Sequence, residues 1–503
     1  MLCYISVDLA IYNFVWCRVL FRMNIGVNLI WGDDSEFEVF AQAQSKDLSL
    51  IFRYSLNLKL SQSLSSRVVN CYYNLSSKDA SETFSDRAAM REALYSSICR
   101  VWDQCAMHPS ISASDVTVEI YEDAERQNQW RISHESLYKQ YVESLLSISS
   151  LFQSEEAKLQ VYYIVDYSSL VQIDHLEGRS RTAIVRCSSG SDSLHVFKGV
   201  DFETFLESRA DFEHRKDVCY HEIRTIFSLP RHPNIIPFAD VFVIVQKIEN
   251  DRQVFVCDTL YSFMEHDTLG DQVKNTKTIE ARLALRNKAI WCFQMASAIA
   301  HTHFTAHTFH MNIKSINFVL DSNQNLILID WEQSEASLYT LAPEANDSWD
   351  VKEAKVESSS SDGADSAVSK LVYERYVDHY RENLAWDRPK WNVYPFWSEF
   401  YSRVLKAAEV FSLDRTMWML LQQVAQSEVE NLDEVVVYWS EDARDIPNDW
   451  KIVMNRCLDL DSNKRIELMN LLNFWEKVKC EDWTNSMCNP DFSGRSLSLR
   501  VAV

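Results

Sequence analysis

The chain is poor in several features that would assign it quickly to a class of protein. Its 12 cysteines contain no Cys-x-x-Cys pair, so the spacing does not support a paired zinc site, and free thiols in a reducing compartment are expected. Basic residues are in deficit, with 50 Lys and Arg against 72 Asp and Glu and a net charge of −22. Because this charge repels phosphate, nucleic acid and anionic membrane are not expected partners.

The N-terminal segment also lacks the apolar run that a membrane span needs. The first 31 residues are rich in apolar side chains, but Asp8, Arg18 and Arg22 interrupt them. The uncharged stretches between these residues are shorter than the ~20 residues of a membrane helix. No signal peptide with a small-residue cleavage site is apparent. We therefore expect an intracellular protein, cytoplasmic or nuclear.

The length and composition suit more than one packed unit. The chain has 503 residues, of which 47% are hydrophobic, enough for two to three domains. Residues 1–155 contain no motif that names a function. Helical spacing predicts helices over Asp86–Met107 and Ser133–Ala157, and alternation predicts a strand at Val116–Ile120. We expect an N-terminal α+β extension that packs on the next domain and whose only suggested function is interaction.

A short polar motif followed by an apolar run is the most informative part of the chain. Lys314 and Asn317 lie two and five residues after Asn312. The apolar run Leu326 to Ile329 is typical of a buried strand, and it ends at Asp330, whose carboxylate it would deliver to a site. Taken alone, these residues fit an ordinary strand-turn-strand with polar ends equally well.

Other segments in a characteristic order lie upstream of this motif. Val196-Phe197-Lys198 predicts a short strand that ends in a lysine, and Glu222 lies in a helical stretch. Ten residues after Glu222 comes the run His232-Pro233-Asn234-Ile235-Ile236. Two apolar strands then follow, at Val241–Gln246 and Gln253–Leu260, with the spacing of a hairpin.

Further segments follow downstream. Apolar residues at helical period from Leu285 to Ile299 predict a long helix just before the polar motif. Leu341-Ala342-Pro343-Glu344 lies a short distance after it. A second predicted helix covers Ala408–Leu420, and a late polar segment ends at Arg465.

Taken in order, these segments resemble the landmarks of the protein kinase superfamily, and individual runs resemble kinase-like proteins of filamentous fungi. The resemblance covers roughly residues 160–478. It implies an α+β, two-lobed protein-kinase-like fold, with a small β-rich N-lobe at about 160–262 and a large α-helical C-lobe at about 263–478. An insertion at about 346–400 would interrupt the C-lobe, and a C-terminal tail would occupy 479–503.

The resemblance also implies ATP and Mg²⁺ as cofactors and gives roles to the residues that match its motifs. A lysine on a strand and a glutamate on a helix pair to position the lysine on the nucleotide phosphates. The expected residues are His310, Asn312 and Lys314 for catalysis; Lys198, Glu222, Gly178, Val185 and Met264 for ATP binding; Asn317 and Asp330 for the metal; and Glu344 with Arg465 as a buried structural ion pair.

The chain departs from the family pattern at two places that matter for activity. Asn312 stands where kinases have the catalytic aspartate, and an amide cannot accept a proton as an anion. General-base assistance is worth about 10²- to 10⁴-fold, so slow or absent phosphotransfer is expected. Glycine is scarce, with 8 residues in the chain. The phosphate-binding loop keeps Gly178 but has Ser180 and Ala183 where the pattern has glycine, so nucleotide affinity is expected to be modest.

Two further departures concern regulation and the branch of the superfamily. Met311 replaces the arginine that would pair with a phosphorylated loop, so a phosphorylation switch is not expected. Trp331-Glu332 after Asp330 resembles the Asp-Trp-Glu of aminoglycoside-kinase-like phosphotransferases, whereas Glu344 and Arg465 favour the protein-kinase branch. Two functions remain open. One is a Ser/Thr-type kinase with slow transfer to a protein substrate, and the other is an inactive pseudokinase scaffold that acts through a regulatory protein partner.

The insertion and two possible metal clusters complete the sequence picture. The acidic stretch Asp347–Ser369 contains a serine-rich core and is predicted to remain unpacked, whereas a following segment with Trp386, Trp391 and Trp397 is expected to dock. Cys99, Cys105 and His108 lack a second pair at zinc-ligand spacing. The histidines of 301–310 are better explained as the end of a helix that leads into the polar motif.

Overall fold

The protein is described from a computed structural model. The structure describes residues 25–32, 36–43, 48–55, 96, 100–101, 116–122, 128–133, 137–152, 162–176, 182–187, 193–207, 209, 211–239, 241–246, 254–278, 281–334, 339–345, 349–356, 368–375, 395–429 and 438–481.

The first sheet has five strands in the order β1-β2-β3-β4-β5. Its strands pair antiparallel except for β3 and β4, which are parallel. The strand predicted at Val116–Ile120 is confirmed as part of β4. Of the helix predicted over Asp86–Met107, the structure describes Ser96, Arg100 and Val101, which are helical. The strands are β1 (Ile25–Gly32), β2 (Glu36–Ala43), β3 (Leu48–Ser55), β4 (Val116–Glu122) and β5 (Asn128–Ser133).

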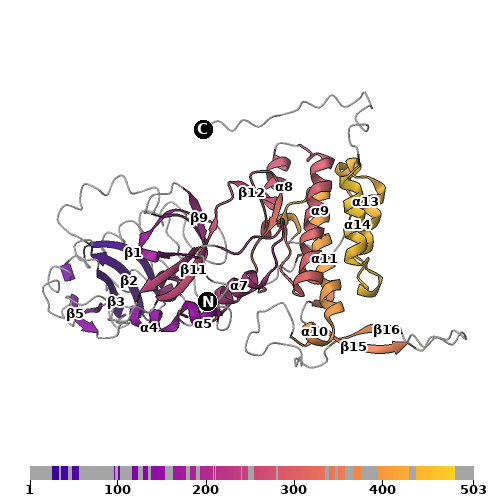
Figure 1. The fold of residues 1–503 in the computed structure, drawn as a ribbon. Coiled ribbons are helices and arrows are strands. Elements are labelled where there is room, and N and C mark those ends of the chain that lie inside the picture. Colours follow the sequence, from indigo (N-terminus) through magenta and orange to yellow (C-terminus); the bar gives the residue numbers. More distant parts are fainter. Residues whose placement is uncertain are drawn as a thin grey trace, which may run out of the picture.

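The second sheet has six strands in the order β6-β10-β11-β9-β8-β7, of which β9 and β11 are labelled in Figure 1. The predicted hairpin is confirmed as the antiparallel pair β10 and β11, and β7, β8 and β9 follow one another as antiparallel neighbours. Because β9 pairs with β11, the residue after β9, Lys198, lies beside the centre of β11. The strands are β6 (Tyr163–Asp166), β7 (Leu170–Leu176), β8 (Thr182–Cys187), β9 (Leu194–Phe197), β10 (Val241–Gln246) and β11 (Val254–Ser262).

Four helices share the core of this second sheet. They are α4 (Leu137–Ser144), α5 (Ile148–Phe152), α6 (Phe202–Glu207) and α7 (Phe212–Ser228). The single helix predicted over Ser133–Ala157 is wrong, because it is broken between α4 and α5. The reason is that the backbone there bonds to β11 and not to a helix: the Val256 N–H donates to the Leu146 carbonyl at 2.9 Å, and Ser147 forms a bridge with Phe255. Thus α4 and α5, which belong to the expected extension, are held against the second sheet.

The C-terminal half of the described chain is mainly helical. Every residue from Ala408 to Gln422 in α11 is buried, and Figure 1 shows α9, α11, α13 and α14 lying side by side. Both predicted long helices are confirmed, as α9 and α11. The elements are β12 (His266–Thr268), α8 (Leu269–Thr278), α9 (Leu285–His301), β13 (Phe318–Leu320), β14 (Leu326–Leu328), α10 (Pro395–Phe400), α11 (Ser402–Gln422), α12 (Gln426–Val429), α13 (Asn448–Cys457) and α14 (Leu468–Lys479).

The expected insertion contains more structure than its composition predicted. The acidic stretch was expected to remain unpacked, which is wrong for both of its ends, because β15 (Trp349–Val356) and β16 (Val368–Arg375) form an antiparallel pair. Val351 and Leu371 are buried, so alternating apolar residues in each strand provide a face that packs. Trp397 is buried as expected. The serine-rich residues 358–363 and the tryptophans at 386 and 391 lie outside the described residues.

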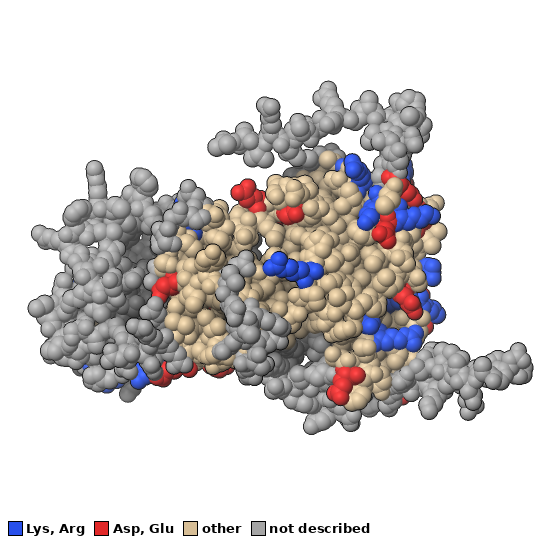
Figure 2. Space-filling view, viewed as in Figure 1, with Lys and Arg blue, Asp and Glu red and all other residues tan. Residues whose placement is uncertain are grey.

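The described chain is therefore a mixed α+β protein. On the face seen in Figure 2, its basic and acidic side chains are interspersed near α13 and α14, so this part of the face has no large area of one charge. In the part of the chain that the structure describes, no helix combines the length and the apolar character needed to cross a membrane.

Candidate functional site

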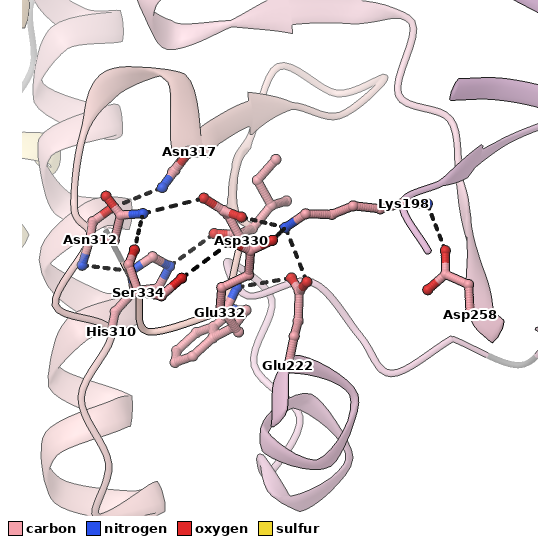
Figure 3. A network of polar contacts seen from close by, with 11 residues as sticks. Lys198, Glu222, Asp258, His310, Asn312, Asn317, Asp330, Glu332 and Ser334 are labelled. Carbon is pink, nitrogen blue, oxygen red and sulfur yellow. Dashed lines mark hydrogen bonds and ion pairs between the residues drawn. The ribbon is translucent and has the colours of Figure 1, made fainter. Parts of the chain in front are cut away.

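The ammonium group of Lys198 lies at the centre of a cluster of carboxylates (Figure 3). Its Nζ donates hydrogen bonds to Glu222 Oε2, at 3.0 Å, and to Asp330 Oδ1, and it forms an ion pair with Glu332 Oε1 at 2.8 Å. Glu222 comes from α7, whereas Asp330 and Glu332 follow β14. The predicted pair of Lys198 with Glu222 is thus formed. The contact of Lys198 with Asp330 joins the second sheet to the segment after β14.

The backbone after β9 is fixed on β11, which sets the position of Lys198. The Lys198 N–H donates to Asp258 Oδ2 at 2.6 Å, and the Val200 N–H donates to the Cys257 carbonyl at 3.0 Å. Between them, Gly199 passes so close to β11 that an added Cβ would lie 2.3 Å from the Cys257 carbonyl oxygen. Glycine is required here because no heavier residue fits the gap.

Glu222 and His310 hold the segment that carries Asp330. The Trp331 N–H donates to Glu222 Oε1 at 3.0 Å, and His310 Nε2 donates to the Ile329 carbonyl at 2.9 Å. Asp330 has a φ of 70°, a left-handed conformation that costs energy for a residue with a Cβ. The bonds on either side of Asp330 offset this cost and keep its carboxylate directed at Lys198.

The amides of the polar motif are part of the same network. Asn312 Nδ2 lies 3.4 Å from both Asp330 Oδ2 and the Ser334 carbonyl, and Asn317 Nδ2 donates to the Asn312 carbonyl at 2.8 Å. The Asn312 Oδ1 atom is buried and has no hydrogen-bond partner. Lys314 is buried and close enough to Asp330 for its charge to lower the pKa of that carboxyl. The structure therefore brings the predicted catalytic and metal-binding residues together.

Glu409 in α11 anchors the start of the motif. Its Oε1 accepts hydrogen bonds from the backbone N–H groups of His310 and Met311, the second at 2.6 Å, and its Oε2 accepts one from His303 Nε2. Met311 has a φ of 54°, so these bonds hold a strained peptide in place. The sequence signal for this role was a charged residue within the short apolar run Ala407 to Phe411.

The predicted ion pair of Glu344 with Arg465 is present and buried. Arg465 Nη2 lies 2.9 Å from Glu344 Oε2, and Nη1 donates to the second carboxylate oxygen. The guanidinium also donates to the carbonyls of Ala407 and Asp459, at 3.0 and 2.8 Å. These bonds use most of the donors of the arginine, which is the condition for burying it.

The charges in the cluster shift one another's pKa in opposite directions. Burial raises the pKa of Glu222 to about 7, because the opposing effect of Lys198 is smaller and Glu332 and Asp330 add to the rise. Burial would also raise the pKa of Asp330, but the charge and hydrogen bond of Lys198 lower it to about 2. Burial lowers the pKa of Lys198, yet the three carboxylates together raise it well above its usual value. Lys198 and Asp330 are therefore charged at neutral pH.

Two of the predicted ATP-binding residues, Val185 and Met264, lie outside this polar network. Gly178 is not among the described residues. Val185 is buried in β8, and Met264 is half-buried in the segment between β11 and β12. Three residues of the network had no role in the sequence predictions: Glu332, Asp258 and Glu409. Asp258, like Glu409, is a buried carboxyl group within an apolar run.

The side chains that could hold a metal are those of the same cluster. Within the described ranges, one group of three possible ligands is found: oxygens of Glu222, Asp330 and Glu332 lie within 4.8 Å of one another. Cys99, Cys105 and His108 lie outside the described residues. Among the described residues, six cysteines have free thiols: Cys187, Cys219, Cys257, Cys292, Cys457 and Cys480.

Comparison with known proteins adds no assignment. No protein-family model matches the chain, and no curated protein matches it.

The buried carboxyl of Asp258 predicts how the stability of the protein depends on pH. Burial raises the pKa of Asp258 from 3.8 to about 7, against the lowering effect of hydrogen bonds from the Lys198 and Thr259 backbone. A carboxyl with a higher pKa in the folded than in the unfolded state binds its proton more tightly when folded. The free energy of unfolding therefore falls as pH rises from about 4 to about 7. The size is at most roughly 4 kcal/mol, at about 1.4 kcal/mol per pKa unit.

We expect Asp258→Asn to remove this part of the pH dependence. The melting temperature of the wild-type protein should fall more between pH 5 and pH 8 than that of the variant, as measured by thermal unfolding at both pH values. Asp449→Asn, at an exposed position of α13, is the matched control and should behave like wild type. Equal slopes for Asp258→Asn and wild type would show that Asp258 is ionised throughout.

Proposed function

We propose that the chain is a nucleotide-binding protein of the two-lobed protein-kinase kind, with Ser/Thr-type phosphotransfer to protein that is impaired because Asn312 replaces the catalytic aspartate. The observation that carries this proposal is the bonding of Lys198 to both Glu222 and Asp330. A lysine so placed between a helix glutamate and a metal-binding aspartate is the arrangement that kinases use to grip nucleotide phosphates.

The arrangement of the elements supports the two-lobed interpretation. The second sheet and α7 form one hydrophobic cluster, with α4 and α5 packed into it. The helices α9, α11, α13 and α14 form another, together with β13 and β14. The residues of the site come from both groups: Lys198 and Glu222 from the first, and Asp330, Asn312 and Asn317 from the second.

The chemistry of the site fits a nucleotide with Mg²⁺. Mg²⁺ prefers oxygen ligands, usually one or two carboxylates together with phosphate oxygens. Asp330 would supply an ionised carboxylate, since its pKa is lowered to about 2. Asn317 uses its Nδ2 to bond the Asn312 carbonyl, which leaves its amide oxygen for a cation. Bound Mg²⁺ would offset negative charge on the phosphate oxygens.

Asn312 determines how much chemistry the site can do. Its side chain lies 3.4 Å from Asp330, so it can orient groups beside the metal-binding carboxylate. It cannot take up a proton from a substrate hydroxyl as a carboxylate would. Positioning and charge stabilisation supply most of the catalysis in phosphoryl transfer. Lys198 and Lys314 can provide both, so slow transfer of phosphate is expected without the aspartate.

A pseudokinase scaffold is the second candidate. It is favoured by the contact of Asn312 Nδ2 with Asp330. At this position a kinase has a catalytic base, whereas here the amide forms a structural contact with the metal-binding carboxylate. In this alternative the bound nucleotide would favour a closed arrangement of the two lobes, and a regulatory protein partner would bind that arrangement.

The proposed binding site predicts stabilisation by nucleotide. Millimolar Mg-ATP should raise the melting temperature by a few degrees, because a ligand that binds only the folded state adds roughly 2.7 kcal/mol at a hundred times its Kd. Lys198→Ala and Asp330→Asn should abolish the rise. Lys477→Ala, at an exposed position of α14, is the matched control and should keep it. The same melting curve with and without Mg-ATP in the wild-type protein would contradict nucleotide binding.

The proposed defect predicts a gain of activity. Asn312→Asp restores an anionic base, so transfer of labelled phosphate from ATP to the protein itself or to a generic protein substrate should rise, by up to about 10²- to 10⁴-fold. Asn323→Asp makes the same chemical change at an exposed turn between β13 and β14 and should give no gain. Robust transfer by the wild-type protein, unchanged by Asn312→Asp, would show that another group is the base. Nucleotide binding without transfer by either protein would favour the scaffold.

A further inference from the structure

Glu332 makes a contact that the proposed nucleotide site does not need. Its Oε1 lies 2.8 Å from Lys198 Nζ, although Glu222 and Asp330 already bind the same ammonium. An ammonium group has three N–H donors. Hydrogen bonds to Glu222 and Asp330 use two of these donors. The Glu332 carboxylate forms an ion pair on the remaining side of the ammonium, where a phosphate oxygen would otherwise bind.

The other contacts of the three carboxylates show which one can leave. Glu222 also accepts the Trp331 N–H at 3.0 Å, and Asp330 also contacts Asn312 Nδ2. The second oxygen of Glu332 accepts from the Ser334 hydroxyl at 3.4 Å, the same distance as the contact of Asn312 with Asp330. Asp330, however, accepts a hydrogen bond from Lys198, whereas Glu332 contacts Lys198 only as an ion pair. The side chain of Glu332 is also the most exposed of the three, at 22% against 11% for Glu222 and 20% for Asp330. Glu332 is thus the carboxylate that is held least firmly in the cluster.

We propose that Glu332 occupies the place of a nucleotide phosphate on Lys198, and that an anionic ligand must displace it in order to bind. This inference rests on the proposed nucleotide site, and in it the Glu332 carboxylate competes with the phosphates for Lys198. The displaced carboxylate stays close to the phosphates, and like charges at short range repel. Glu332 therefore lowers the affinity for the polyphosphate part of a nucleotide and leaves that for the adenosine part unchanged.

The competition also defines how a divalent cation acts. A cation near Asp330 and Glu332 offsets their negative charge, so the penalty that Glu332 imposes on a polyphosphate is largest when no divalent cation is present. Glu332 is consequently a specificity determinant, because it discriminates against free ATP in favour of ATP with its cation and against highly charged nucleotides in favour of less charged ones.

The test compares ATP, inorganic tripolyphosphate and adenosine by titration calorimetry on the full chain. Glu332→Gln keeps the shape and a neutral acceptor for Lys198 but removes the charge. With EDTA, this variant should bind ATP and tripolyphosphate about tenfold more tightly than wild type, with adenosine unchanged. With Mg²⁺ the gain should be smaller. Glu332→Asp, which keeps the charge, should not show the gain, and Glu476→Gln at an exposed position of α14 is the control for net charge.

Three outcomes would overturn the inference, and they can be told apart. Equal ATP affinity in Glu332→Gln and wild type would mean that the carboxylate does not compete. Weaker binding of ATP by the variant only in the presence of Mg²⁺ would make Glu332 a ligand of the cation. Absence of binding of all three ligands by every protein would instead refute the proposed nucleotide site itself, and the inference with it.

Discussion

The ammonium of Lys198 is buried among carboxylates that come from two separate parts of the chain. Taking a charge out of water is costly, and the cost is offset only when partners of opposite sign are well placed. Glu222 and Asp330 supply this compensation, and in doing so they tie α7 and the segment after β14 to the end of β9. Removal of the Lys198 charge would leave these carboxylates without their common counter-ion. The positions of these segments relative to one another therefore depend on a single cation.

Two other sets of buried charged groups bind the backbone nearby. Glu409, in the fully buried part of α11, binds the backbone of His310 and Met311. Arg465 and Glu344 bind one another and nearby carbonyls. In each case a charge inside an apolar core is satisfied by several hydrogen bonds, which restricts the backbone to one arrangement. The backbone just before Asn312 is thus bonded to Glu409.

Features that depend on the order of motifs and on the spacing of apolar residues were predicted from the sequence. Lys198, Glu222 and Asp330 were expected to meet, and the long buried helices were expected from their apolar spacing. The sequence could not show that Glu332 would share Lys198, because that contact depends on how the chain bends after Asp330. The break between α4 and α5 was also missed, because the backbone there bonds to a strand more than a hundred residues away. The role of Glu409 likewise depends on three-dimensional contacts.

A crystal structure of the protein with Mg²⁺ and a non-hydrolysable ATP analogue would test the central claim most directly. The account predicts phosphate oxygens on Lys198 Nζ in place of the Glu332 carboxylate, and a cation bound by Asp330 and the Asn317 amide oxygen. It also predicts that the Asn312 side chain will lie beside the terminal phosphate. A nucleotide bound elsewhere, or an unchanged Lys198 cluster at saturating analogue, would contradict the account.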